Sequence, residues 1–325
     1  MKACVLHAIS DLRYEDLPDP VREQGEVLIH IKASGICGSD IARVFEKGTY
    51  HFPTIPGHEF AGEIIDADDK SIIGKKCAVF PLIPCRNCES CQTGHYAQCS
   101  NYNYFGSRCD GGFAEYISVP FWNVVLAPDD LDYELIAMAE PCAVALHCIE
   151  QAEIQVGASV CVIGAGPIGI MLGKWALLKG ALKVCLVDID ENKIKFAREM
   201  GFETTADGSY DVVIEGTGTS SGYENAVNAA KTFGTVVLMG NPAKEMVLSQ
   251  KTYWKILREE LTLKGTWNSS YSTFKNDWKT SLEFIKKMDI SRIISHRFDF
   301  KDCNKAFDTI HERKEFVNKI MFINK

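Results

Sequence analysis

The hydrophobic and polar positions change their rhythm along the chain. Up to about residue 125, short segments alternate apolar and polar residues between glycines and prolines, which predicts the antiparallel strands of a barrel-like domain. From about residue 132 to 150 the apolar positions take helical spacing. From residue 159 onward, short apolar runs alternate with helical segments, as in a parallel sheet covered on both faces. The pattern therefore predicts an α/β chain, with a β-barrel domain before a doubly wound parallel-sheet domain.

Length and composition agree with two domains and exclude some functions. The chain has 325 residues, 46% hydrophobic and 24% charged, which is enough for two cores. Its 43 acidic and 35 basic side chains give a net charge of −8, which argues against a nucleic-acid binder. The apolar stretch 156–173 contains glycines and a proline, so we interpret it as strand, turn and helix rather than a membrane span. Charges at residues 11–16 interrupt any apolar signal core, so we expect a cytoplasmic protein.

A glycine-rich turn follows the first buried strand of the second half. In a GxGxxG turn, the glycines allow a tight bend, and the next helix offers free N–H groups to a pyrophosphate. Asp188 ends the following strand, where a carboxylate binds the adenosine ribose and repels a 2′-phosphate. The alternative is a tight turn that binds nothing, but strand, helix and acid are all in place. We therefore expect NAD(H), with candidate cofactor-binding residues Gly164, Gly166, Pro167, Ile168, Gly169 and Asp188.

Four of the thirteen cysteines cluster in the segment 85–99. In a reducing compartment, clustered cysteines indicate a metal site rather than disulfides. Four thiolates at this spacing can hold one tetrahedral zinc ion in a closed site. A ferredoxin-type iron–sulfur motif would bring its fourth cysteine after three residues, with a proline behind it, whereas here seven residues intervene and Ser100 follows. The segment predicts a structural zinc site formed by Cys85, Cys88, Cys91 and Cys99.

A second group of metal-ligand residues is dispersed along the chain. It comprises Cys37, the neighbours His58 and Glu59, and Glu140. A thiolate, an imidazole and a carboxylate suit a zinc ion that keeps one position open for water or an alcohol oxygen. Taken singly, each residue has an ordinary explanation as a core cysteine, a buried histidine or a helix-capping glutamate. Spacing alone leaves these alternatives open.

The order of the motifs resembles a known family. GICGSD, PGHEFAGEI, CxxCxxCx7C, GGFAEY and GAGPIG follow one another as in zinc-dependent medium-chain dehydrogenases/reductases, and the resemblance covers the whole chain. The segments around these motifs are most similar to the polyol and polyol-phosphate branch. The resemblance implies a GroES-like β-barrel catalytic domain over 1–148 and a Rossmann cofactor domain over 149–270. Residues 271–325 would return to the catalytic domain.

The resemblance also implies a role for each candidate at the metal. Cys37, His58 and Glu140 would hold a catalytic zinc, with Glu59 beside them as an alternative ligand. Asp40 would hydrogen-bond the ligand histidine. Two zinc ions per chain are expected, one catalytic and one structural.

Other positions match residues that bind substrate and cofactor in the family. Ser39 would touch the substrate oxygen and start the proton path. The turns at Thr217, Gly240 and Trp267 would line the nicotinamide end of the cofactor site. Trp267, with the two residues after it, would contact polyol hydroxyls.

The activity implied is reversible, NAD-dependent oxidation of a secondary alcohol of a polyol or polyol phosphate to a ketose. Galactitol 1-phosphate, giving tagatose 6-phosphate, is the first substrate expected. Sorbitol or L-iditol, a ribulose-phosphate type sugar, butanediol and threonine are alternatives. A further alternative is an inactive dinucleotide-binding or structural protein. The presence of all four candidate metal-site residues argues against it, because a non-enzyme does not need them. The expected partners are a small-molecule substrate and further copies of the chain, as a homodimer or homotetramer, with neither nucleic acid nor membrane.

A phosphorylated substrate requires a cation to bind the phosphate. Arg43, Lys47 and Arg108 are the candidates, because guanidinium and ammonium groups bind phosphate. The alternative for each is an ordinary solvated surface charge.

The sequence departs from the family at two places. Ala42 occupies the position of the relay histidine of alcohol dehydrogenases, and His51 lies too far along to replace it. We therefore expect protons to leave through water and the glutamates. Only residues 207–210 separate the segments TTAD and DVVIEG, where the family usually has a crossover helix. The arrangement of the sheet edge formed by these segments is therefore left open.

Overall fold

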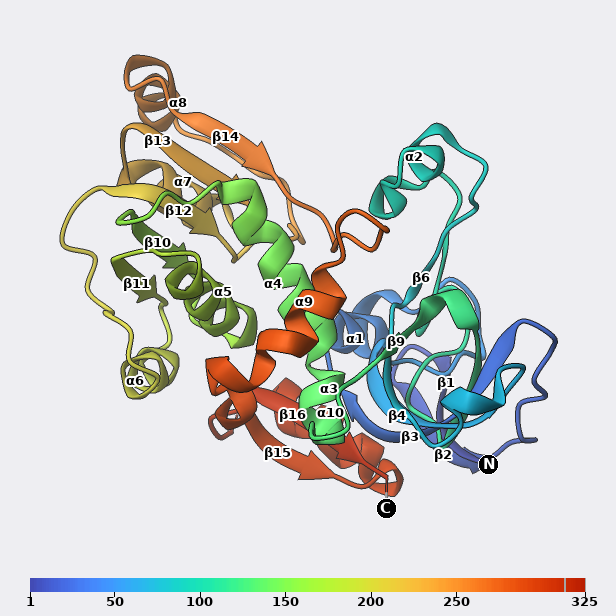
Figure 1. Ribbon diagram of the computed structural model, residues 1–325. Helices are drawn as coiled ribbons and strands as arrows, with labels where there is room; N and C mark the ends of the chain where they lie inside the picture. The colour runs from blue at the N-terminus through green and yellow to red at the C-terminus, as the bar shows by residue number, and fades with distance from the viewer. Residues whose placement is uncertain (313, 325) are drawn as a thin grey trace. The chain divides into compact units, whose positions relative to one another are not determined.

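The computed structural model describes residues 1–312 and 314–324 (Figure 1). By its internal contacts the chain divides into two compact units. Unit 1 comprises Met1–Pro141 and Ser270–Lys325, and unit 2 comprises Cys142–Ser269. The first division and the boundary expected at 148/149 both lie within helix α4 (Ala139–Ala152), and the second division lies one residue before the expected 270/271.

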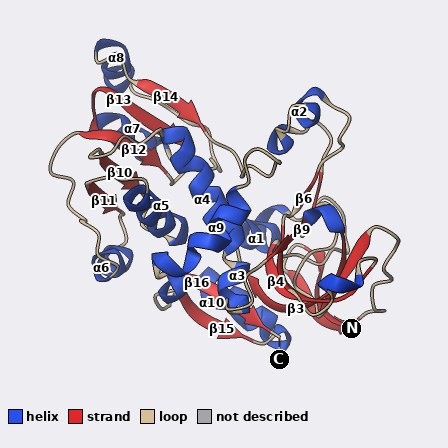
Figure 2. Ribbon diagram, in the orientation of Figure 1, coloured by secondary structure: helices blue, strands red, loops and turns tan. Residues whose placement is uncertain are grey.

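Unit 1 is built mainly of β-strands (Figure 2). Its largest sheet has the order β15-β16-β3-β4-β5-β9, with β8 also paired to β3. The strands are β1 (Lys2–Ala8), β2 (Asp11–Asp16), β3 (Glu26–Gly35), β4 (Glu59–Ala67), β5 (Lys76–Val79), β6 (Leu82–Ile83), β7 (Asn103–Tyr104), β8 (Tyr116–Pro120), β9 (Val124–Leu126), β15 (Ile294–Phe298) and β16 (Lys319–Ile323). The helices are α1 (Gly38–Ala42), α2 (Glu89–Gln92), α3 (Tyr133–Ala137), α9 (Asp277–Phe284) and α10 (Cys303–Glu312).

The alternation seen in the sequence explains how these strands form a core. In β3, successive side chains alternate between buried and half-buried positions over most of the strand, because neighbouring residues of a strand point to opposite faces. Val27, Ile29 and Ile31 thereby enter a core shared with Phe60 of β4 and Phe322 of β16. The last strand of the chain thus packs against strands near its beginning, with Met321 opposite Gly35.

Unit 2 carries a five-stranded parallel sheet with the order β11-β10-β12-β13-β14. Its strands are β10 (Ser159–Ile163), β11 (Lys183–Val187), β12 (Tyr210–Glu215), β13 (Ala230–Leu238) and β14 (Thr262–Gly265). Helix α5 (Pro167–Leu178) packs against β10 and β11, and α7 (Ser220–Ala229) packs against β12 and β13. Unit 2 also contains α6 (Glu191–Glu199), α8 (Gln250–Arg258) and the greater part of α4. The prediction of a parallel sheet in this half of the chain is confirmed.

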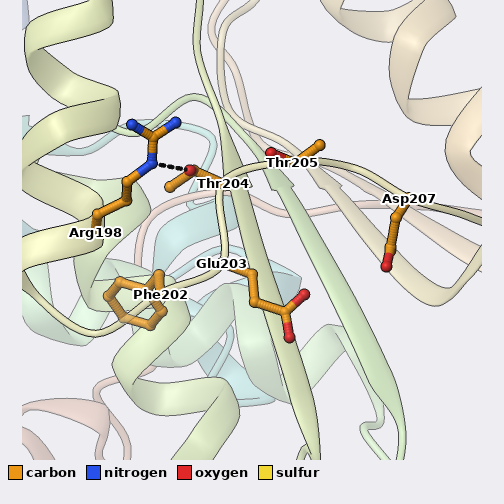
Figure 3. A pocket seen from close by; sticks show the side chains of 6 residues that line it. All are labelled: Arg198, Phe202, Glu203, Thr204, Thr205 and Asp207. Atoms are coloured by element: carbon orange, nitrogen blue, oxygen red, sulfur yellow. Dashed lines mark hydrogen bonds between the residues drawn. The ribbon is translucent and has the colours of Figure 1, made fainter.

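Between α6 and β12 the chain adds no regular strand to this sheet. After α6 the chain forms a single parallel bridge between Cys185 and Glu203, where Leu186 N donates to Glu203 O over 2.8 Å, and it then enters β12. A shallow hollow of about 500 Å³ lies beside the bridge, and Arg198 there donates to Thr204 Oγ1 over 2.7 Å (Figure 3). Strand β11 is therefore the edge of the regular sheet, and the hollow contains none of the predicted site residues.

The apolar stretch 156–173 contains strand β10, a turn and the first half of helix α5. Within residues 1–312 and 314–324, no helix combines the length and apolar character needed to cross a membrane.

Candidate functional site

The four clustered cysteines converge as the sequence predicts. Their sulfur atoms all lie within 4.8 Å of one another, with Cys85 Sγ 4.0 Å from Cys91 Sγ and Cys88 Sγ 3.9 Å from Cys99 Sγ. A tetrahedral site with Zn–S bonds of about 2.3 Å has edges of about 3.8 Å, so the sulfurs fit one zinc ion. Backbone N–H groups, from Ser100 first, lower the pKa of Cys88 to about 6 and favour its thiolate. The donor set suits a closed structural site.

The second metal cluster is brought together by the pairing of β3 with β4. Gly35 lies opposite Glu59 in this antiparallel ladder, so Cys37, just beyond β3, lies beside His58, just before β4. The ligand atoms of Cys37, His58 and Glu59 all lie within 4.8 Å of one another. A thiolate, an imidazole and a carboxylate form a donor set that fits zinc.

Glu140 lies near this cluster without joining its most compact part. It is the second residue of helix α4 and is buried, and its oxygens do not lie within 4.8 Å of all three other ligand atoms. Burial raises the pKa of Glu140 to about 7; the His58 charge opposes this shift and the Glu59 charge adds to it. In this conformation Glu59 therefore occupies the position in the cluster that the sequence assigned first to Glu140.

Asp40 lies beside the ligand histidine and carries a negative charge there. It is fully buried at the third position of α1, where its Oδ2 accepts a hydrogen bond from Cys37 N (3.0 Å). Its Oδ1 lies 3.2 Å from His58 Nδ1 and 3.1 Å from Arg43 Nη1. Burial raises the pKa of Asp40, but His58 and Arg43 outweigh burial and hold the pKa below its usual range. Arg43 Nη1 also donates to Ser39 Oγ over 2.8 Å.

The three candidate phosphate-binding cations have different surroundings. Arg43 is engaged by Asp40 and Ser39. Lys47 is exposed at the end of a π-helical turn. Arg108 is half-buried, with its guanidinium over two tyrosine rings.

Lys319 is a residue of this cluster that the sequence analysis missed. It opens β16, is 5% exposed, and forms an ion pair with Glu59 Oε2. Burial lowers the pKa of Lys319, but the charges of Glu59 and Cys37 outweigh burial and hold it above its usual value. A Cβ atom on Gly35 would stand 2.4 Å from Glu59 Oε2 and 3.0 Å from Lys319 Cε, so only glycine leaves space for the pair. A lysine at the head of the apolar segment KIMFI was the one signal in the sequence.

Tyr104 is a second residue that the sequence analysis missed. It ends β7, and its ring centre lies 5.7 Å from that of His58. Burial, with the nearby charges of Glu140 and Cys37, holds the pKa of Tyr104 well above its usual value. The phenol therefore stays protonated beside the cluster and can donate a hydrogen bond.

In unit 2 the glycine-rich turn has the geometry expected of a phosphate-binding turn. Gly164 has φ +112°, and a Cβ on Gly169 would stand 2.0 Å from Gly164 O. Gly166 is the N-cap of α5, and Pro167 follows at its first turn. Asp188 Oδ2 accepts a hydrogen bond from Ala165 N over 2.9 Å, which ties the turn to the end of β11.

The remaining cofactor candidates follow the neighbouring strands. Thr217 comes after β12 and Gly240 comes after β13. The backbone N–H of Thr217 donates to the Glu215 carboxylate over 2.7 Å, and that of Gly240 donates to the Glu215 carbonyl over 2.9 Å. Trp267 follows β14 and is 54% exposed. The carboxyl ends of parallel strands form one edge of the sheet, the usual place for a dinucleotide. Glu215, which is buried and tightens this edge, was not among the predicted residues.

Known proteins resemble both units. A model of the alcohol dehydrogenase GroES-like domain matches residues 23–129, and a model of the zinc-binding dehydrogenases matches residues 167–287. Galactitol 1-phosphate 5-dehydrogenase of Escherichia coli K12 is 33% identical over 332 aligned positions, which cover 95% of each chain. The chain is a zinc-dependent medium-chain dehydrogenase. The family resemblance and the fold, a GroES-like barrel with a Rossmann domain, are confirmed.

Solved structures of such dehydrogenases have the same fold as this chain. The crystal structure of galactitol-1-phosphate dehydrogenase from Escherichia coli matches with a TM-score of 0.93, at 32% identity and with complete coverage of both chains. A zinc-binding dehydrogenase of Sinorhizobium meliloti bound to NADP matches with a TM-score of 0.91, at 26% identity over 99% of each chain. This medium-chain dehydrogenase is thus an oxidoreductase with zinc and a nicotinamide dinucleotide as cofactors.

Proposed function

We propose that this dehydrogenase oxidises a secondary alcohol of a polyol phosphate to the ketose, with NAD as hydride acceptor. Galactitol 1-phosphate, giving tagatose 6-phosphate, is the substrate we favour. The observation that carries the proposal is the compact set of Cys37, His58 and Glu59 ligand atoms, with Asp40 behind the histidine. The similarity to galactitol 1-phosphate 5-dehydrogenase supports the choice of substrate.

Cys37 and His58, with a glutamate, would hold the catalytic metal. Glu59 is the nearer carboxylate in this conformation, and Glu140 is the alternative. Zinc bound there supplies a Lewis acid that makes a substrate hydroxyl easier to deprotonate. Asp40 keeps the His58 ring oriented toward this position, a role that such carboxylates take behind ligand histidines.

Ser39 is the residue that we expect to handle the substrate proton. Its Oγ accepts a hydrogen bond from Arg43 and keeps a second lone pair, which can accept the proton of the substrate hydroxyl while the serine's own proton is passed on. The guanidinium cannot take up a proton at ordinary pH, and Ala42 offers no base. The proton released on oxidation therefore passes from Ser39 to water, and the reverse reaction uses the same path.

The turn at Gly164–Gly169 would bind the pyrophosphate of the cofactor, and Asp188 the adenosine ribose. Free N–H groups at the start of α5 favour the negative charge. The Asp188 carboxylate repels a 2′-phosphate, which favours NAD over NADP.

We also propose that the chain assembles as a homodimer or homotetramer. Helix α8 exposes Tyr253, Trp254 and Leu257, and the edge strand β14 exposes Leu263. Apolar side chains gathered on one region of a surface are typical of an interface. The cytoplasmic location expected from the sequence stays a prediction.

NADH formation tests the proposed activity. Zinc-loaded protein is assayed with NAD and galactitol 1-phosphate, galactitol, sorbitol or L-threonine, and again after zinc removal and readdition. We expect the highest kcat/KM with galactitol 1-phosphate, and loss and recovery of activity with zinc. A higher kcat/KM with a free polyol or with threonine would reject the proposed substrate.

A further inference from the structure

Arg108 is held between two aromatic rings. Its guanidinium carbon lies 4.2 Å from the ring centre of Tyr50 and 4.5 Å from that of Tyr102, and its Nη2 donates to the Tyr50 hydroxyl over 3.3 Å. Within the described part of the chain, no carboxylate lies within 4.0 Å of this guanidinium. A guanidinium stacked on aromatic faces keeps the N–H groups of its edge for a ligand, and its planar fork matches phosphate.

The backbone holds this arginine in a tight turn. Arg108 N donates to Tyr104 O over 2.9 Å, and a ring nitrogen of His51 lies 3.2 Å from Arg108 O. Gly106, with φ +77°, donates from its N–H to Cys109 O over 2.8 Å within the same turn. Because backbone and side chain are both restrained, Arg108 loses little conformational entropy when it binds an anion.

The same turn connects Arg108 to the metal cluster. Tyr104 begins the turn, and its ring packs 5.7 Å from His58. The Tyr102 ring packs edge-on against Tyr104 at 6.3 Å, and the guanidinium stacks on Tyr102. Two ring contacts therefore link the ligand histidine to the arginine, so Arg108 belongs to the same region of unit 1 as the metal cluster.

The rival cations fit an anion less well. The charge of Arg43 is already shared with the buried Asp40 carboxylate. Lys47 is exposed, so its side chain would lose more conformational entropy on binding an anion, and its ammonium group cannot form the paired hydrogen bonds of a planar guanidinium.

We propose that Arg108, clamped between Tyr50 and Tyr102, binds the phosphate of a polyol-phosphate substrate and selects it over the free polyol. This inference rests on the proposed function, which it extends to a specificity-determining residue. The ligand is a phosphate monoester on a carbon remote from the oxidised one.

Steady-state kinetics with matched variants test this role. Arg108→Gln should lower kcat/KM for galactitol 1-phosphate by about 10- to 100-fold, mainly through KM, because a charge-assisted hydrogen bond is lost. For free galactitol it should stay within about threefold of wild type, since no charged partner is lost there. Arg108→Lys should restore part of the preference. Lys47→Gln, which removes one exposed charge of the same unit, should leave the preference unchanged.

The outcomes separate this inference from the proposed function. If wild type prefers the phosphate ester and Arg108→Gln keeps that preference, or Lys47→Gln loses it, the role of Arg108 is wrong and the proposed function stands. If wild type shows no preference, the proposed substrate is wrong. Competitive inhibition by inorganic phosphate then tests whether Arg108 forms an anion site. Inhibition of wild type but not of Arg108→Gln supports the anion site; equal inhibition, or none, rejects it.

A second variant covers a failure of Arg108→Gln to fold. Tyr50 is 69% exposed, so Tyr50→Ala should fold while it frees one face of the guanidinium. We expect a severalfold higher KM for galactitol 1-phosphate and an unchanged KM for galactitol. Equal effects on both substrates, or none, would reject the clamp.

Discussion

Replacement of Lys319 by methionine tests the buried ion pair beside the metal cluster. Glu59 and Lys319 are only 2% and 5% exposed, and their charged groups are in direct contact. Methionine keeps most of the side-chain volume, so the main loss is the positive charge. Removing one partner of a buried pair leaves the other charge uncompensated and costs about 3–5 kcal/mol. We expect this loss in the zinc-free protein, and a smaller loss with zinc, because the cation supplies a compensating charge.

Urea unfolding of the zinc-free and zinc-loaded proteins measures both values. The double variant Glu59→Gln/Lys319→Met should cost less than Lys319→Met alone, since no unpaired charge remains buried. Lys255→Met, which breaks an i,i+4 surface pair with Glu259, is the matched control and should cost less than about 1 kcal/mol. A loss below about 1 kcal/mol for Lys319→Met without zinc would refute the reasoning.

Three further predictions use other parts of the chain. Cys91→Ser should lose one zinc per chain and lower the melting temperature, measured by elemental analysis and calorimetry, because a structural zinc contributes folding free energy. Asp211 is partly buried, which raises its pKa, but Lys231 and Ser159 lower the pKa to about 2. Because its pKa is lowered on folding, the Asp211 carboxylate stabilises the fold at pH values above the unfolded-state pKa of about 4, and this stabilisation is lost as the pH falls toward 2. Asp211→Asn should therefore lower the free energy of unfolding in urea by about 1 kcal/mol at pH 7, and by less at pH 3. Asp188→Ala should raise KM for NAD and lower KM for NADP in NADH and NADPH formation, whereas unchanged values would remove Asp188 from the ribose site.

Features set by local spacing could be predicted from the sequence. The four cysteines of the structural zinc site lie within the short segment 85–99, so their spacing along the chain is enough to bring the sulfurs together. The turn at Gly164 to Gly169 is equally local, because strand, turn and helix follow one another directly. The antiparallel and parallel sheets follow from the different spacing of apolar residues in the two halves of the chain. These residues alternate with polar ones in the first half and form short continuous runs in the second.

Features that depend on the register of distant strands could not be predicted. Lys319 meets Glu59 only because β16 joins the sheet beside β3, with Gly35 between the two side chains. Tyr104 reaches His58 because a long loop returns the chain to β7, which pairs with β6, and nothing in the residues next to Tyr104 indicates a role. The metal ligands themselves were selected by resemblance, since each has a plain structural explanation when taken singly.

The assignment of the catalytic metal is tested most directly by the zinc content and NADH formation of Cys37→Ser beside wild type. We expect the variant to contain one zinc per chain where wild type contains two, to keep its melting transition, and to form no NADH from galactitol 1-phosphate or any polyol that wild type oxidises. Two zinc ions per chain together with wild-type turnover would show that Cys37 does not hold the catalytic metal.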